Sequence, residues 1–180
     1  INAGIVSLDM ANIQKKFGNY ALVRAIAVDG LEYLDGANKY KQLAGLYHAA
    51  SVGYKEQKKY IRALEFNNKA IRLYEDSLTR GKIKQKDFLI YKNTRANILR
   101  ENGEYTEAIQ LYDELLSDKD VLKSKVKQAR YIDNKGYALW LQNPSNPKAK
   151  DLLLEGLSLR KNLNSDEALM ASNLHLTDYY

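Results

Sequence analysis

The stretch Gly103-Glu104-Tyr105-Thr106-Glu107-Ala108, followed by Tyr112 and Leu115, has the pattern of a turn between two packed helices. Its glycine can end one helix, because glycine readily adopts the left-handed conformation found at helix C-termini. Ala108, Tyr112 and Leu115 are spaced three or four residues apart, which predicts one face of a second helix. Ala96, in the preceding segment, is a small residue twelve positions before Ala108. The stretch therefore predicts an antiparallel helical hairpin.

The same spacing of small or apolar residues recurs along the chain. In each predicted hairpin, a small residue of the first helix precedes its counterpart in the second by twelve or thirteen positions, and a further packed position follows seven residues later. The four sets are Ala11, Val23 and Gly30; Ser51, Ala63 and Ala70; Ala96, Ala108 and Leu115; and Gly136, Ala149 and Gly156. Two helices approach to about 8 Å only where the side chains between them are small. These positions are therefore expected to be buried where the helices cross.

The spacing predicts four hairpins and half of a fifth within the 180 residues. The predicted repeats are 4–35, 37–77, 87–117 and 120–162, with the first helix of a fifth at 165–180. Asn146-Pro147 is typical of a helix start, as cap and first-turn residue. Asn164 followed by Glu167 predicts a capping box. Because the fifth helix has no partner in the sequence, we expect the chain to be a piece of a longer protein.

Composition favours thin layers of helices over other architectures. The chain has 45% hydrophobic residues, two prolines, and fourteen tyrosines against three phenylalanines and one tryptophan. A tyrosine ring can pack between helices while its hydroxyl stays in water. The absence of cysteine excludes disulfides and thiolate chemistry. No apolar run approaches the roughly 20 residues of a membrane span.

Residues able to perform catalysis are sparse. The two histidines, His48 and His175, lie in different predicted repeats and outside the common metal-binding spacings. The glycines are scattered, and neither a phosphate-binding loop nor a nucleophile elbow is present. We therefore expect a protein that is not an enzyme and that uses no cofactor and no metal.

The third repeat resembles the tetratricopeptide repeat (TPR) family through Ala96, Leu99, Gly103, Tyr105, Ala108 and Tyr112. The repeat period here is 40 to 45 residues, longer than the roughly 34 of the common form, and is similar to long-period bacterial members. The resemblance implies an all-α fold in which antiparallel helical hairpins form a right-handed superhelix, one solenoid over residues 1–180. It also implies that the chain binds a protein or a peptide.

In a helical-hairpin solenoid the first helix of each hairpin lines the concave groove. Groove positions are expected about one turn before and after each small packing residue. Asparagine can bond an extended peptide backbone, arginine can hold a carboxylate, and tyrosine and tryptophan supply contact area. The predicted groove residues are Asn12, Lys15, His48, Lys55, Asn93, Asn97, Arg100, Arg130, Tyr137 and Trp140.

Two functions compete at this stage. The first is a protein- or peptide-binding scaffold, serving as the sensor or interaction segment of a bacterial signalling or transcription-regulatory protein. The second is a nucleic-acid-binding repeat protein, suggested by the net charge of +6 and by lysine clusters at 55–59, 82–86 and 123–127. Acidic residues in or beside these clusters, such as Glu56 and Asp87, favour an ordinary solvated helix face, so the scaffold is the preferred hypothesis. The compartment (cytoplasmic or periplasmic), the partner and the oligomeric state are left open.

Overall fold

The computed structural model describes residues 2–78, 83–161, 163 and 166–180, and all regular secondary structure in these ranges is helical. The helices are α1 (Asn2–Lys16), α2 (Tyr20–Glu32), α3 (Tyr40–Glu56), α4 (Tyr60–Leu78), α5 (Gln85–Glu101), α6 (Tyr105–Leu116), α7 (Lys119–Leu122), α8 (Lys125–Gln142), α9 (Pro147–Lys161) and α10 (Asp166–Tyr179). In sequence order, helices α1–α2, α3–α4, α5–α6 and α8–α9 fall in the four segments predicted as hairpins, and α10 falls in the segment predicted as the fifth first helix. The predicted all-α class of consecutive helical hairpins is confirmed.

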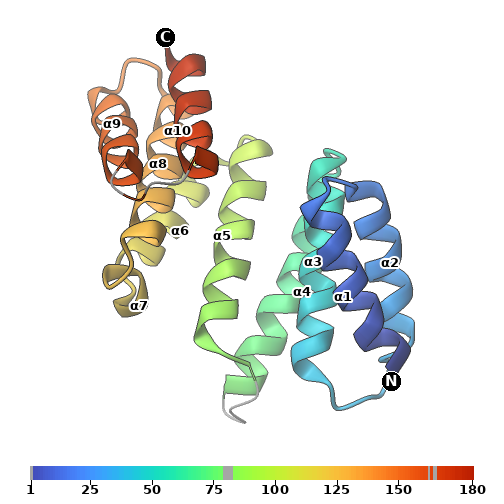
Figure 1. The fold of residues 1–180 in the computed structure, drawn as a ribbon. Helices are drawn as coiled ribbons and strands as arrows, with labels where there is room; N and C mark the ends of the chain where they lie inside the picture. The colour runs from blue at the N-terminus through green and yellow to red at the C-terminus, as the bar shows by residue number, and fades with distance from the viewer. Residues whose placement is uncertain (1, 79–82, 162, 164–165) are drawn as a thin grey trace. The chain divides into compact units, whose positions relative to one another are not determined.

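The helices belong to two compact units, residues Ile1–Ile98 (unit 1) and Leu99–Tyr180 (unit 2). In unit 1, α2 packs on α1 and on α3, and α3 packs on α4; Figure 1 shows α1 and α2 running antiparallel side by side. In unit 2, α8 packs on α6 and α9, and α10 packs on α8 and α9. The continuous solenoid over residues 1–180 and its right-handed superhelical sweep stay predictions.

All twelve positions of the predicted small-residue pattern are buried. The glycines among them explain why the helices can lie so close together. A Cβ placed on Gly136 in α8 would lie 3.0 Å from the backbone nitrogen of Leu153 in α9. A Cβ on Gly156 in α9 would lie 2.8 Å from the Cβ of Asp133 in α8. The hairpin α8–α9 is therefore held at a separation that only glycine permits at these two positions.

Helix ends agree with the sequence in two places. Gly103 has φ +87°, and after it the Glu104 amide donates to the Leu99 carbonyl at 2.9 Å, which ends α5. The Asn146 Oδ1 accepts a hydrogen bond from the Lys148 amide at 3.1 Å, so Asn146 caps α9 as predicted. The proposed capping box at Asn164 lies outside the described residues and stays a prediction.

One helical turn, α7, was not foreseen. The Asp118 side chain accepts a hydrogen bond from the Asp120 amide at 2.8 Å and thereby caps it. Val121 is fully buried and anchors this turn, which packs on α6 and α8 within unit 2. An aspartate shortly before an apolar pair is a plausible helix cap, so Asp118 is a local signal for this turn.

Among its described residues, unit 1 has two buried clusters of hydrophobic residues. The first joins α1, α2 and α3 around Ala11, Val23 and Leu46. The second lies around Tyr74 and Tyr91, and in it the rings of Tyr74 and Phe88 stack with centroids 4.0 Å apart. Tyrosines thus fill the spaces between helices, as the composition predicted. Within the described ranges, none of the helices is both long enough and apolar enough to cross a membrane.

Candidate functional site

Unit 2 carries a cluster of stacked aromatic rings on α8 and α10. The ring of Tyr137 stacks on His175, with centroids 4.1 Å apart and planes 9° apart. It also stacks on Trp140 at 5.5 Å. The guanidinium carbon of Arg100 lies 5.1 Å from the centroid of the Tyr137 ring, within the range of a cation–π interaction. Tyr137 is therefore the centre of a cluster of planar groups.

Tyr137, His175 and Arg100 form one wall of a pocket of about 410 Å³, called here the Tyr137 pocket. Its lining residues, all in unit 2, are Arg100, Glu101, Tyr105, Tyr137, Leu141, Leu174, His175 and Asp178. The Tyr137 hydroxyl donates a hydrogen bond to Asp178 Oδ2 at 2.7 Å. Burial and this hydrogen bond raise the pKa of Tyr137 to about 12, so the phenol stays neutral at physiological pH. The pocket combines apolar, aromatic and charged surfaces, as sites for peptide side chains commonly do.

Arg100 is the least satisfied polar group of this pocket. Its side chain is 11% exposed, and its Nη2 lies 3.7 Å from Glu101 Oε1, which is a long ion pair. Its Nε and Nη1 are buried and have no hydrogen-bond partner among the described residues. A buried donor without an acceptor costs about 1–3 kcal/mol, and more when it is charged. Because these two atoms have no exposed surface, only the exposed remainder of the Arg100 side chain can meet an acceptor supplied by a bound molecule.

A buried charge network holds the His175 wall of the pocket in place. Asp133 on α8 has no exposed surface and accepts a hydrogen bond from His175 Nδ1 at 2.8 Å. Asp133 Oδ1 accepts a hydrogen bond from the Ser172 hydroxyl at 3.0 Å. Asp133 Oδ2, the oxygen bonded to His175, also lies 3.3 Å from Arg160 Nη2. Arg160 also donates to the Ser172 oxygen at 2.9 Å. Because a carboxylate only accepts, Nδ1 of His175 carries the proton, and the ring orientation beside Tyr137 is fixed.

The network has the residue types of a catalytic triad but not its geometry. A nucleophilic serine must bond to the histidine that takes its proton. The Ser172 hydroxyl is instead engaged with Asp133 and Arg160. The arrangement therefore orients His175 and does not activate Ser172.

The structure brings together three of the four predicted groove residues of unit 2. Arg100, Tyr137 and Trp140 form the cluster described above. Trp140 does not itself line the pocket; its ring lies 6.2 Å from that of Tyr179 on α10. Arg130 is exposed on α8 and is not among the lining residues. Arg130 thus provides a matched control for Arg100 in binding experiments.

The predicted groove residues of unit 1 are more dispersed. Asn12 is exposed on α1, and Lys55 on α3 forms an ion pair with Glu56 at 2.6 Å. Asn93 and Asn97 on α5 are half-buried. Lys15 is also half-buried, and burial lowers its pKa. Their contacts with a ligand stay predictions.

His48 is packed inside unit 1. Only 9% of its surface is exposed, its Nε2 lies 3.0 Å from Thr94 Oγ1, and its ring lies 5.0 Å from that of Tyr91. Burial, together with the positive charge of Lys15, lowers the pKa of His48 to about 3. A ligand contact by His48 would require this side chain to leave its packing. That contact stays a prediction, as it does for the other groove residues of unit 1.

The pKa of His48 predicts an acid sensitivity of unit 1. The unfolded chain binds a proton at His48 near pH 6.5, whereas the folded chain does so only near pH 3, so stability falls as the pH drops through this window. Between pH 7 and pH 5 we expect the free energy of unfolding to fall by about 2 kcal/mol from this residue. Urea unfolding followed by circular dichroism measures the drop, and His48→Gln should abolish most of it. An equal drop in the wild type and in His48→Gln would contradict the conclusion that His48 causes the acid sensitivity.

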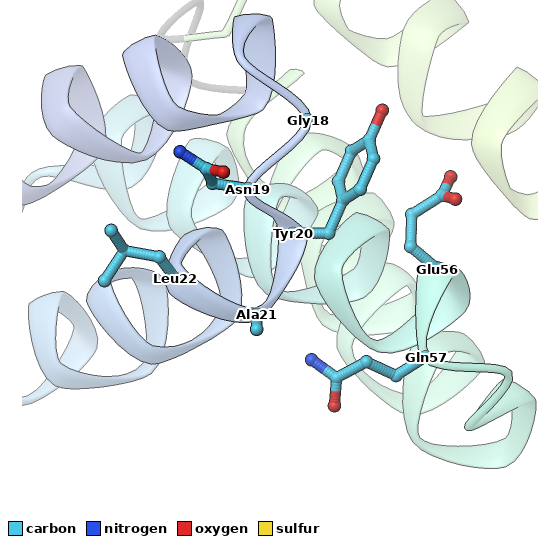
Figure 2. A pocket seen from close by; sticks show the side chains of 7 residues that line it. All are labelled: Gly18, Asn19, Tyr20, Ala21, Leu22, Glu56 and Gln57. Carbon is cyan, nitrogen blue, oxygen red and sulfur yellow. The ribbon is translucent and has the colours of Figure 1, made fainter.

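A second pocket, of about 540 Å³, lies in unit 1 beside the turn between α1 and α2. Figure 2 shows its lining, with the Gln57 side chain directed toward the start of α2 near Ala21. Much of the wall comes from the turn itself, at Gly18 and Asn19. Its one charged lining residue, Glu56, is already paired with Lys55. The pocket contains none of the predicted groove residues and has less binding chemistry than the Tyr137 pocket.

The buried charge network was not predicted from the sequence. A signal was present, because the charged residues lie in register with the small buried ones. Asp133 falls between Ala129 and Gly136 at helical spacing, and Arg160 follows Gly156 by one turn. A charge at a core-facing position predicts a buried partner of opposite sign.

Comparison with known proteins supports only the fold of this chain. No protein-family profile matches the chain, and no curated protein matches it. A solved structure of a kinesin-light-chain-like protein from Podosopora anserina, with nearly identical TPR-like repeats, aligns with 97% of this chain and 84% of that chain. The TM-score is 0.60 and the sequence identity is 14%. The fold of this chain is a TPR-like array of helical hairpins, the class of architecture that the third repeat predicted.

Proposed function

We propose that this chain is a scaffold that binds a protein partner, and that the Tyr137 pocket receives a peptide segment of it. The observation that carries the proposal is the pocket lining, in which the Arg100 guanidinium lies over the Tyr137 ring beside an aromatic wall. Tyrosine, tryptophan and arginine are the residues that most often dominate binding energy in protein interfaces. TPR-like hairpin arrays supply such surfaces on rigid helices.

The chemistry of the pocket indicates what part of a peptide it holds. Glu101 and Asp178 already place two carboxylates in the lining, so a peptide carbonyl is a more favourable acceptor for Arg100 than another carboxylate. Leu141 and Leu174 offer an apolar surface to a neighbouring side chain. We infer a ligand segment that presents a carbonyl oxygen to Arg100 and an apolar or aromatic side chain to the leucines.

The test is selection from a library of displayed random peptides on the immobilised chain. Enriched peptides are then measured against Arg100→Gln and Arg130→Gln, which remove the same charge from unit 2. Loss of charged hydrogen bonds should weaken binding about 10- to 100-fold in Arg100→Gln. Arg130→Gln should bind as the wild type does. Failure to enrich any peptide over the bare support, or equal weakening in both variants, would overturn the proposal.

Nucleic-acid binding, the second candidate, is supported only by the net charge of +6. It predicts retardation of a labelled single-stranded oligonucleotide at low ionic strength, with affinity falling steeply as salt is added. Because that attraction depends on total charge, Arg100→Gln and Arg130→Gln should then weaken it alike. The same pair of variants therefore distinguishes the two functions.

A role as the interaction segment of a bacterial signalling or transcription-regulatory protein is a narrower proposal. It is supported by the long repeat period alone. The full-length gene tests it: an output domain, such as a kinase or a DNA-binding domain, should be encoded in the same reading frame. A gene without such a domain would remove this narrower role and leave the scaffold proposal intact.

A further inference from the structure

Helix α1 and the residue that follows it expose a row of apolar side chains on a face separate from the buried one. The buried face carries Gly4 and Ala11, which pack in the core of unit 1. The exposed row consists of Ala3, Val6, Met10 and Ile13 of α1 and of Phe17 in the turn directly after the helix, and is called here the α1 seam. Its four larger members are 47–74% exposed. An aligned row of this kind differs from the scattered apolar residues normal on protein surfaces.

The spacing of the α1 seam is that of a coiled coil. Successive members are three, four, three and four residues apart, so they occupy alternating a and d positions of a heptad. The four members within α1 extend over about 15 Å of helix, and Phe17 follows at its end. A soluble helix that packs only on its own domain needs one apolar stripe, whereas α1 has a second, separate one. The second stripe is suited to a second helix.

The charged residues beside the α1 seam indicate what kind of second helix would pack on it. Asp9 and Lys16 occupy two successive g positions on one flank, and both are exposed. Neither forms an ion pair within the described residues. In an antiparallel pair of identical helices, g positions face g positions. Asp9 of one copy would then meet Lys16 of the other, twice, by symmetry.

The apolar residues fit the same antiparallel arrangement. A two-fold axis between Ala11 and Asn12 pairs Val6 with Phe17 of the other copy, and Met10 with Ile13. Each layer then pairs two different side chains, Val6 with the larger Phe17 and Met10 with Ile13, which helps to fill the space between the helices. A parallel arrangement would instead place Phe17 against Phe17 and leave the two charges without opposite partners.

We propose that the α1 seam is a self-association surface through which two copies of this chain form an antiparallel α1–α1 dimer. One short helix pair buries an area at the low end for specific interfaces, so the dimer should dissociate in the micromolar range. The proposal is independent of the Tyr137 pocket, which lies in unit 2.

Sedimentation equilibrium of the 180-residue chain, across the micromolar range, tests the dimer. Ile13→Ser should raise the dissociation constant at least tenfold, because it removes an apolar side chain from a central layer. Ile61→Ser, which alters an 81%-exposed isoleucine on α4 away from the seam, should leave it unchanged. Circular dichroism checks that both variants remain folded. A wild-type chain that is monomeric at every concentration would overturn the proposal.

A charge exchange tests the antiparallel pairing itself. Asp9→Lys alone and Lys16→Asp alone should each weaken the dimer, because like charges then face each other. An equimolar mixture of these two variants should form heterodimers, since every facing pair is again opposite in charge. The double variant should also dimerise by itself. Single variants that dimerise as well as the wild type, or a mixture no tighter than its components, would contradict an antiparallel second copy as the occupant.

Discussion

Replacing Asp133 with alanine is expected to destabilise unit 2 by about 3–5 kcal/mol, because it leaves a buried guanidinium without its counter-charge. The Arg160 side chain is 6% exposed, and burial already lowers its pKa, while Asp133 acts in the opposite direction. The same substitution removes acceptors from Ser172 and His175. Urea unfolding followed by circular dichroism measures the loss.

Asp113→Ala is the matched control, since Asp113 is ion-paired with Lys135 in the same unit but is 54% exposed. Exposed pairs contribute at most about 1 kcal/mol. The double variant Asp133→Leu with Arg160→Met should recover part of the stability lost in Asp133→Ala, because no uncompensated buried charge remains. Equal losses for Asp133→Ala and Asp113→Ala would show that the network contributes no more than a surface pair.

Replacing Gly136 with valine is expected to cost about 1–3 kcal/mol or more, because it forces α8 and α9 apart. An added Cβ would lie 2.9 Å from the Cβ of Leu152, 3.0 Å from the Leu153 nitrogen and 3.1 Å from the Ala149 carbonyl oxygen. Two of these are backbone atoms, which cannot move aside as a flexible side chain can. The midpoint of thermal unfolding should fall accordingly.

Gly103→Asn provides the comparison for Gly136→Val. Gly103 has φ +87° and no atom within 4 Å of an added Cβ, and asparagine tolerates the left-handed conformation. We expect a loss well below that of Gly136→Val. If both variants unfold at the same temperature, close helix packing is not what makes Gly136 necessary.

The repeat pattern was predictable because helix packing imposes local rules on the sequence. One role is shared by four small buried residues of the first helices, Ala11, Ser51, Ala96 and Gly136. Small side chains at a fixed spacing can be recognised in a sequence. The cap at Asn146 was predictable for the same reason, because the residue and the proline that follows it act within one turn.

The candidate site was only partly predictable, because its members come from separate helices. Tyr137 and Arg100 were identified from their positions beside the packing residues. The stack of Tyr137 on His175 depends on the rotation of α10 about its axis, which no local pattern specifies. The burial of His48 was not predictable either, because helical spacing does not show that Tyr91 and Thr94 of another helix cover this side chain.

The most direct test of binding through the Tyr137 pocket is calorimetric titration of a library-selected peptide into the wild type, Arg100→Gln and Arg130→Gln. We predict one binding site per chain, a dissociation constant raised about 10- to 100-fold by Arg100→Gln, and no change for Arg130→Gln. Unchanged affinity in Arg100→Gln, with the variant fully folded, would contradict binding at this pocket.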